Sequence, residues 1–174
     1  MALHRPSVVI KHATLRDLSY IAANLRSEDH AEIACQVPQG TKPEAIARSS
    51  LAAGEARVVF RNGLPCGAFG FVPVSDGVLS AWAYGMRGFE RCIPAVTRHV
   101  YREFVSQWMQ GNIRRIEART IENHDSAHRW LEKAGAVRCC TLEQWGRNGE
   151  RFYLYEWVRG CVPVATYRRW GHVL

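Results

Sequence analysis

Side chains that can move protons are concentrated in the run SEDHAEI, residues 27–33. This run contains Glu28, Asp29, His30 and Glu32. Carboxylates and imidazoles are common general acids and bases in enzymes. Acids at the start of a helix also stabilise it through the helix dipole, so Glu28 and Asp29 have a structural explanation as well as a catalytic one.

Metal-binding chemistry has little support in this sequence. His124 and His128 stand one helical turn apart in ENHDSAHRWLEKAGA, residues 122–136, but no third ligand is evident, and solvated polar residues on a helix explain the pair. The cysteines form no CxxC pair and no zinc-ligand spacing, so we expect free thiols and neither a metal site nor a disulfide framework. They are Cys35, Cys66, Cys92, Cys139, Cys140 and Cys161.

The positive charge of the chain comes almost entirely from arginine. The 174 residues carry a net charge of +7, and the only lysines are Lys11, Lys42 and Lys133. Guanidinium groups suit bidentate contacts to phosphate or carboxylate, which favours an anionic ligand or an acidic protein partner. The basic residues are spread along the chain rather than gathered in one stripe, which argues against a nucleic-acid-binding protein.

Composition predicts one domain over residues 1–160, followed by a tail over 161–174 that is expected to pack on it. No apolar run approaches the ~20 residues needed to span a bilayer. The N-terminus MALHRPSVVIKHA lacks the apolar stretch and cleavage site of a signal peptide. We therefore expect a cytoplasmic protein that does not associate with membranes.

The elements that must position these residues begin with a strand, SVVIKHATL, followed by three helices. Thr14 and Asp17 resemble a capping box at the first helix, Ser27 is the expected N-cap of the second, and Pro43 suits the first turn of the third. The expected helices cover residues 15–26, 27–37 and 43–53.

The middle of the chain predicts an antiparallel meander. The apolar segments RVVFRNG, LPCGAFGFVPV and DGVLSAWAYGM are divided by Asn-Gly and Asp-Gly, which are strong hairpin signals. A long helix over 92–110 and a strand over 113–120 follow, then the helix of ENHDSAHRWLEKAGA. Two strands, VRCCTLEQWG and RFYLYEWVR, complete the domain across a turn at 146–149.

This order of elements resembles the GNAT superfamily of acyl-CoA-dependent N-acyltransferases. HDSAHRWLEKAGA is similar to that family's helix pattern N-x-x-A-x-x-L-Y-x-x-x-G-F, with His124 at the Asn, Ala127 at the Ala, Leu131 at the Tyr and Gly135 at the Gly. The resemblance implies an α+β fold with a mixed, mostly antiparallel central sheet of about seven strands flanked by helices. Leu131 departs from the pattern, because leucine cannot donate the proton that the family's tyrosine gives to the CoA thiolate.

The resemblance also implies acetyl-CoA, or another acyl-CoA, as the cofactor. Its phosphates should lie between the third meander strand and the long helix, where AYGMRGFERCIP departs from the family's R/Q-x-x-G-x-G/A. Backbone N–H groups at Gly85 and Gly88 would approach the phosphates there, or these glycines only shape a turn, and Glu90 would repel phosphate. The residues expected to bind the cofactor are Tyr84, Gly85, Met86, Arg87, Gly88, Arg91, His124, Ala127 and Leu131.

Acyl transfer to an amine needs a base, an oxyanion donor and an acid. The resemblance places Asp29 and His30 on the helix that roofs the acceptor side, so they are the expected bases. Glu117 is another candidate base, competing with a salt bridge to a neighbouring arginine. Tyr84 is the expected acid, or lines the acyl pocket, or is a plain strand residue, and the backbone N–H groups of 84–86 are the expected oxyanion donors.

A narrower resemblance is carried by WAYG, the long helix, RRIEART and AHRWLEKAGA, which together are similar to small GNAT-like proteins of short-tailed bacteriophages. The phosphate loop is commonly degenerate in that group. Two functions therefore stay open. One is a phage-encoded acyltransferase that modifies an amine of a small molecule or host protein in the host cytoplasm. The other is a catalytically degenerate GNAT-like protein that binds a host protein or serves as a virion component, and a homodimer is compatible with either.

Overall fold

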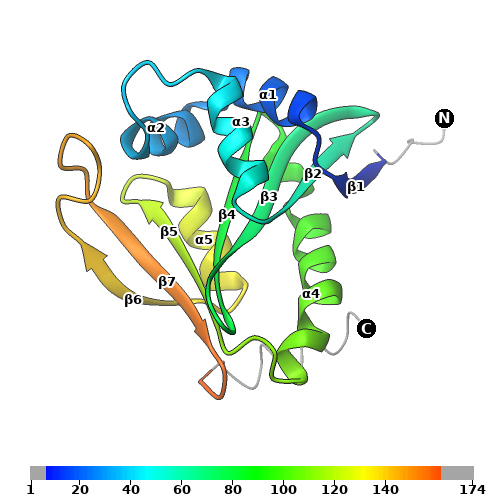
Figure 1. Ribbon diagram of the computed structural model, residues 1–174, viewed down its shortest axis with the longest axis vertical. Coiled ribbons are helices and arrows are strands. Elements are labelled where there is room, and N and C mark those ends of the chain that lie inside the picture. Colours follow the sequence, from blue (N-terminus) through cyan, green and yellow to red (C-terminus); the bar gives the residue numbers. More distant parts are fainter. Residues whose placement is uncertain (1–6, 162–174) are drawn as a thin grey trace.

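A computed structural model describes residues 7–161, and for residues 104–109 it describes the backbone only. The chain forms one seven-stranded sheet in the order β1-β2-β3-β4-β5-β7-β6 (Figure 1). Every neighbouring pair is antiparallel except β4 and β5, which are parallel. The strands are β1 (Val8–His12), β2 (Glu55–Arg61), β3 (Leu64–Ser75), β4 (Val78–Gly85), β5 (Arg115–Ile121), β6 (Val137–Leu142) and β7 (Phe152–Val158). The predicted mixed, mostly antiparallel sheet is confirmed.

Five α-helices flank the sheet in the described part of the chain, in the predicted order. They are α1 (Leu15–Ala23), α2 (Ser27–Gln36), α3 (Pro43–Ala52), α4 (Ile93–Met109) and α5 (Asp125–Lys133), and a 3₁₀ turn, η1 (Phe89–Cys92), precedes α4. None of these helices has the length and apolar character needed to cross a bilayer. The predicted tail, residues 161–174, lies outside the described residues except for Cys161.

The predicted N-cap of α2 is wrong by one residue. Ser27 is the first residue of α2 rather than its N-cap, and its hydroxyl bonds to the Glu28 carboxylate at 2.8 Å. Arg26 is the N-cap, and its side chain makes no cap bond because it reaches forward to Asp29. The start of α2 is therefore set by a contact of Arg26 that a capping rule does not contain.

The meander turns follow their sequence signals. Asn62 and Gly63 have φ angles of 52° and 81°, the positive values that a tight two-residue hairpin turn requires. Gly77, in the next turn, has φ 70°. Both turns keep β2, β3 and β4 in the antiparallel order that the sequence predicts.

Side chains on the two faces of the sheet belong to two cores. On one face α1 and α3 pack against the meander through Leu18, Ile21, Ala47, Val58, Ala68 and Tyr84. On the other face the core beneath α4 contains Val59, Phe69, Phe71, Phe89, Cys92, Val96, Tyr101 and Ile113. α5 extends this second layer, where Leu131 packs with Ala118 and Tyr155.

The sheet is divided between β4 and β5. Only four residue pairs join these strands, Val78–Ala81 with Arg115–Ala118. Beyond Ala81 and Ala118 the ladder ends, although β4 continues to Gly85 and β5 continues to Ile121. The inner edges of both strands are therefore open at their C-terminal ends, and α2 makes contacts with both of them.

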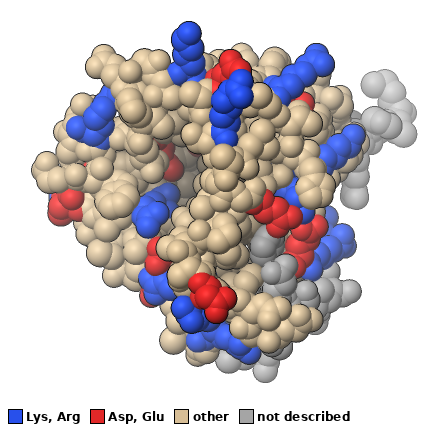
Figure 2. Space-filling view, viewed as in Figure 1, with Lys and Arg blue, Asp and Glu red and all other residues tan. Residues whose placement is uncertain are grey.

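Charge of both signs is scattered over the face of the molecule that Figure 2 shows. On the face that Figure 2 shows, Lys and Arg side chains stand apart from one another, with Asp and Glu side chains between them. No single basic stripe crosses this face, in keeping with the distribution along the sequence.

Candidate functional site

A cavity of about 460 Å³ lies at the β4–β5 division. Its walls come from α2, α4 and α5, and its floor includes Ala81 and Ala83 of β4 and Ala118 of β5. One end is polar, with Arg26, Asp29, Glu32 and His124, and the other end is enclosed by Phe71, Val100, Tyr101, Ile116 and Trp157. This volume lies in the range of small-molecule binding pockets.

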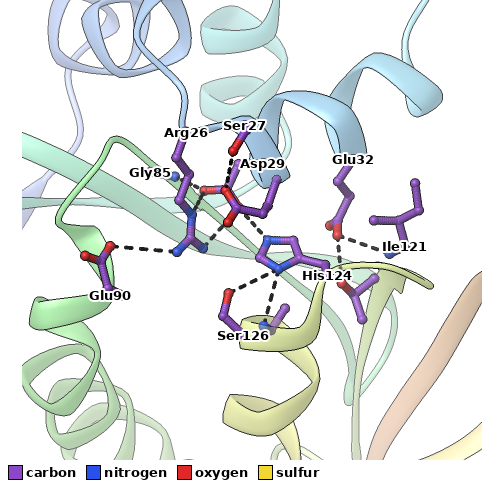
Figure 3. Close-up of polar contacts among 12 residues, drawn as sticks. Arg26, Ser27, Asp29, Glu32, Gly85, Glu90, Ile121, His124 and Ser126 are labelled. Atoms are coloured by element: carbon purple, nitrogen blue, oxygen red, sulfur yellow. Dashed lines mark hydrogen bonds and ion pairs between the residues drawn. The ribbon is translucent and has the colours of Figure 1, made fainter.

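Asp29 lies at the centre of the polar end and is only 4% exposed (Figure 3). Its Oδ2 accepts from the Gly85 N–H and from Arg26 Nε, each at 2.7 Å, and its Oδ1 accepts from Arg26 Nη2 at 3.1 Å. His124 Nε2 lies 2.7 Å from Oδ1 and must carry the proton, because a carboxylate only accepts. We call Arg26, Asp29, Gly85 and His124 the Asp29 clamp.

The charges in this clamp shift its pKa values. Burial raises the pKa of Asp29, but hydrogen bonds from His124 and Arg26 outweigh burial and leave that pKa below its usual value. Burial lowers the pKa of His124, but the carboxylates of Asp29 and Glu32 outweigh it and raise that pKa. The clamp therefore favours a negative Asp29 and a positive His124.

His124 is also the N-cap of α5. Its Nδ1 lies 3.3 Å from the Ala127 backbone N–H and accepts from it in the neutral ring, as an asparagine oxygen would, and protonation of Nδ1 removes this cap while keeping the bond of Nε2 to Asp29. A second histidine, His128, is buried and hydrogen-bonds the Tyr155 hydroxyl at 2.9 Å. The expectation that both histidines are solvated is wrong, because each has partners inside the protein.

Glu32 lies one helical turn after Asp29 and faces the other strand. Its Oε2 accepts from the Thr120 hydroxyl at 2.7 Å and from the Ile121 N–H at 3.1 Å, so it caps the open edge of β5 as Asp29 caps that of β4 (Figure 3). Burial raises the pKa of Glu32, and the hydrogen bond from Thr120 only partly opposes it. A cavity-lining carboxylate with a raised pKa has the properties of a general base.

The backbone of β4 supplies a hydrogen-bond donor to the same cavity. Backbone groups of successive strand residues point alternately to either side of the strand. The N–H and C=O of Gly85 both bond to the α2 segment, so the backbone of Ala83, two residues earlier, faces the same gap. Because the β4–β5 ladder ends at Ala81, the Ala83 N–H has no ladder partner and lines the cavity.

The predicted phosphate loop has internal partners for its backbone donors. Gly88 has φ 98°, and its N–H donates to Glu90 Oε2 at 3.0 Å. The Met86 N–H donates to the Cys66 carbonyl at 2.8 Å, and the Gly85 N–H is held by the clamp. A carboxylate of the protein thus occupies the donor at Gly88 that the sequence assigns to phosphate.

Five of the predicted site residues meet at the cavity. They are Asp29, Tyr84, His124, Ala127 and Leu131. Tyr84 is buried, its hydroxyl lies 3.0 Å from Ser50 Oγ, and its ring stacks on Trp82. Burial raises the pKa of Tyr84, so its hydroxyl stays protonated.

Other predicted site residues lie outside the cavity lining. His30 is exposed, and Arg87 and Arg91 are exposed on the loop. Glu117 accepts from Arg115 Nε at 2.7 Å and lies 3.5 Å from Arg119, which matches the salt-bridge explanation of this residue. Gly85, Met86 and Gly88 stand at the end of β4 without lining the cavity.

Glu32 is one of the four acid–base candidates in SEDHAEI but not one of the expected bases, and Ala83 is not among the expected site residues. Asp29 and Glu32 are three residues apart and share one helix face, whereas His30 is turned away by about 100° from Asp29 on a 3.6-residue helix. This spacing is a signal that could have found Glu32. Ala83 acts through its backbone, which no side-chain pattern reveals.

The fold is that of the GNAT acetyltransferases, as the order of elements predicts. No family model and no curated protein matches the chain by sequence.

The particular similarities are to solved structures. A protein assigned as an acetyltransferase matches with TM-score 0.74, 14% identity and coverage of 100% of both chains. RimJ of Mycobacterium smegmatis in complex with CoA-disulfide matches with TM-score 0.67, 14% identity and coverage of 95% of this chain and 88% of that one. Ribosomal-protein-S5-alanine acetyltransferase of Vibrio fischeri matches with TM-score 0.63, 14% identity and coverage of 90% and 95%. At this identity the likeness shows the fold alone.

Proposed function

We propose that this protein is an acyl-CoA-dependent N-acyltransferase that modifies an amine of a small molecule or a protein. The observation that carries the proposal is the β4–β5 gap, where the Ala83 N–H and the Glu32 carboxylate line one cavity. An oxyanion donor and a base are what acyl transfer to an amine needs. The RimJ structure with CoA-disulfide supports an acyl-CoA as the donor.

In the proposed reaction, Glu32 takes a proton from the ammonium of the acceptor. The free amine attacks the thioester carbonyl carbon, and the oxyanion that forms accepts a hydrogen bond from the Ala83 N–H. The C–N bond forms, the attacking nitrogen loses its second proton to water, the C–S bond breaks, and the CoA thiolate leaves. The thiolate then takes a proton, for which Tyr84, whose hydroxyl lies against Ser50 of α3, is the candidate donor in place of the missing tyrosine at Leu131.

Asp29 has a different role in this proposal. Its four hydrogen bonds use both carboxylate oxygens, and its lowered pKa makes it a weak base. It is a positioning residue that holds Glu32 on α2 over the gap. His30 and Glu117 do not line the cavity, so this proposal gives them no chemical step. They stay candidates for contacts to the acceptor.

One observation favours the second function, a GNAT-like scaffold that has lost turnover and binds a host protein or serves as a virion component. Glu90 occupies the Gly88 N–H, and a phosphate cannot share that donor. In an active enzyme, Glu90 must leave Gly88 when CoA binds, and Arg87 and Arg91 would then hold the phosphates. A phage origin and a site of action in the host cytoplasm belong to the same proposal.

Calorimetric titration with acetyl-CoA and CoA separates the two functions. We expect saturable micromolar binding to the wild-type protein, weakened by Arg87→Ala and Arg91→Ala and strengthened roughly tenfold by Glu90→Gln, which is ~1.4 kcal/mol. Glu44→Gln and Arg48→Ala, an exposed pair on α3, are the matched controls and should change nothing. No binding of the wild type and of Glu90→Gln at millimolar cofactor would contradict the enzyme and favour the binding protein.

A further inference from the structure

The cavity continues well beyond the groups that acyl transfer needs. On β4 the Ala83 N–H lies four residues from Leu79, which pairs with Ile116 of β5, and Ile116 pairs in turn with Trp157 of β7. At about 3.3 Å per residue, the aromatic end of the cavity is roughly 13 Å along the sheet from the Ala83 N–H. An acetyl group would leave this whole length empty.

Small side chains create the space. Ala81, Ala83 and Ala118 form the floor of the cavity, and Ala134 lines it from the end of α5. Protein interiors are close-packed, and a void that larger side chains could fill lowers stability. A cavity kept open by four alanines is therefore better explained by a ligand than by packing.

The tryptophans that line this cavity already use their indole N–H groups in hydrogen bonds within the protein. The Trp157 indole N–H donates to the Ala134 carbonyl at 2.9 Å, and the Trp130 indole N–H donates to Thr97 Oγ1 at 2.9 Å. Both rings thus present only apolar surface to the cavity, beside Phe71, Val100 and Ile116, and Tyr101 is the residue of this end that carries a polar group. The cations of α5 that line the cavity, Arg129 and Lys133, are exposed and belong to its rim.

The distribution of polar groups along the cavity indicates where the pantetheine arm and the acyl group of a thioester donor can lie. The pantetheine arm carries two amides, and burying an amide without a partner costs free energy. Open backbone groups are found in the gap, at Ala83, where β4 and β5 no longer pair. The arm therefore suits the gap, and the far end suits a group without polar atoms.

The geometry points to a donor whose acyl group is an extended apolar chain, longer than acetyl, that lies on the alanine floor with its end against Trp157 and Ile116. This inference rests on the proposed acyltransferase function and names the class of acyl group that the same site takes. Its chemical basis is burial of methylene groups, each of which strengthens binding.

Titration calorimetry of the full chain with acetyl-, butyryl-, hexanoyl- and octanoyl-CoA tests it without an acceptor. We expect the dissociation constant to fall with each added pair of carbons, by at least roughly tenfold from acetyl to octanoyl. Ala81→Leu fills the floor and should remove the gain for octanoyl-CoA over acetyl-CoA. Ala45→Leu, on the exposed side of α3, is the matched control and should keep the full gain.

Equal affinity for all chain lengths in the wild type would overturn the inference and leave the proposed function standing. Absence of binding at every chain length would overturn the proposed function together with the inference. If Ala81→Leu fails to fold, the wild-type series still decides, because it needs no variant.

Discussion

At the scale of single residues, two carboxylates on one helix face have pKa values shifted in opposite directions. Asp29 is buried and Glu32, on the same helix, is half-buried, yet Asp29 has a lowered pKa and Glu32 a raised one. The difference comes from their partners, since Asp29 faces the cations Arg26 and His124 while Glu32 faces the neutral donors of Thr120 and Ile121. Pairs of acids whose environments separate their pKa values mark acid–base sites in enzymes.

Replacing Glu32 by glutamine removes the proposed base and keeps its hydrogen bonds. We expect Glu32→Gln to lower kcat by roughly 10²- to 10⁴-fold, with little change in KM for the acyl donor. The wild type should lose activity as the pH falls through the pKa of Glu32, which lies above 4.5 because burial raises it, and the variant should lack this limb. Steady-state kinetics from pH 5 to 9, followed by thiol release, measure both effects.

The matched control is Glu28→Gln, one turn earlier on α2 and bonded only to Ser27 in the described residues. Its kcat should stay within about twofold of the wild type. An equal loss in both variants would show that the effect comes from the charge of the helix rather than from Glu32.

At the scale of elements, α2 joins the two halves of the sheet. The Asp29 clamp holds the end of β4 and the start of α5, and Glu32 holds the end of β5. A short helix with a modest apolar face thus has its position fixed by buried polar contacts. Such contacts contribute little net free energy when intact, but removing one partner is costly because the other charge stays buried.

Asp29→Asn should therefore lower the free energy of unfolding by about 3 kcal/mol, because Arg26 and the protonated His124 lose their counter-charge. Urea denaturation at neutral pH measures the change. Asp125→Asn, an exposed acid in the first turn of α5, is the control, with an expected loss below about 1 kcal/mol. Similar losses in the two variants would contradict a structural role for the clamp.

The clamp also predicts a pH dependence of stability. The pKa of His124 in the folded protein lies above 6.5, so its protonated form stabilises the fold fully below 6.5 and this contribution is lost as the pH rises through the folded pKa. Asp29, with a lowered pKa, contributes above 3.8 and loses its contribution only as the pH falls through its folded pKa. Urea unfolding between pH 6 and 9 should show a falling free energy.

His124→Asn is the control for this measurement, because asparagine keeps an N-cap acceptor and does not titrate. The difference in slope between wild type and variant isolates His124 from the other histidines. Parallel curves would contradict the raised pKa of His124.

The sequence predicts local elements better than the site that they build. The hairpin turns at Asn62–Gly63 and Gly77 and the glycine that ends α5, with φ 86° at Gly135, depend on neighbouring residues and follow from pattern. The Asp29 clamp joins positions 56 and 95 residues apart, and no local rule contains those contacts. The Ser27 cap failed because of a local contact outside the capping rule, the pairing of Arg26 with Asp29 three residues later.

At the scale of the whole molecule, the net charge of +7 has no matching surface feature on the face in view. Acids stand between the basic side chains there, and several arginines are paired with carboxylates, among them Arg57, Arg115 and Arg151. A surface on which charges of both signs alternate attracts anions weakly and does not guide them to one place. It suits a site that selects its ligand by shape and local contacts.

Binding to duplex DNA should accordingly be weak. In fluorescence anisotropy at physiological salt we expect no saturation below roughly 10⁻⁶ M, the regime of non-specific binding. The same titration at low salt should show modest binding that does not depend on base sequence. Nanomolar binding with a steep salt dependence would contradict the acyltransferase and favour a nucleic-acid-binding protein.

The contacts of α2 with β5 and α5 also affect the order in which the chain can fold during synthesis. Glu32 is synthesised 88 residues before Thr120, and Asp29 is synthesised 95 residues before His124. At ribosomal rates of about 5–20 residues per second, these acids wait on the order of ten seconds for their partners. Burying these acids without partners would be costly, so we expect α2 to dock only after β5 and α5 have been synthesised.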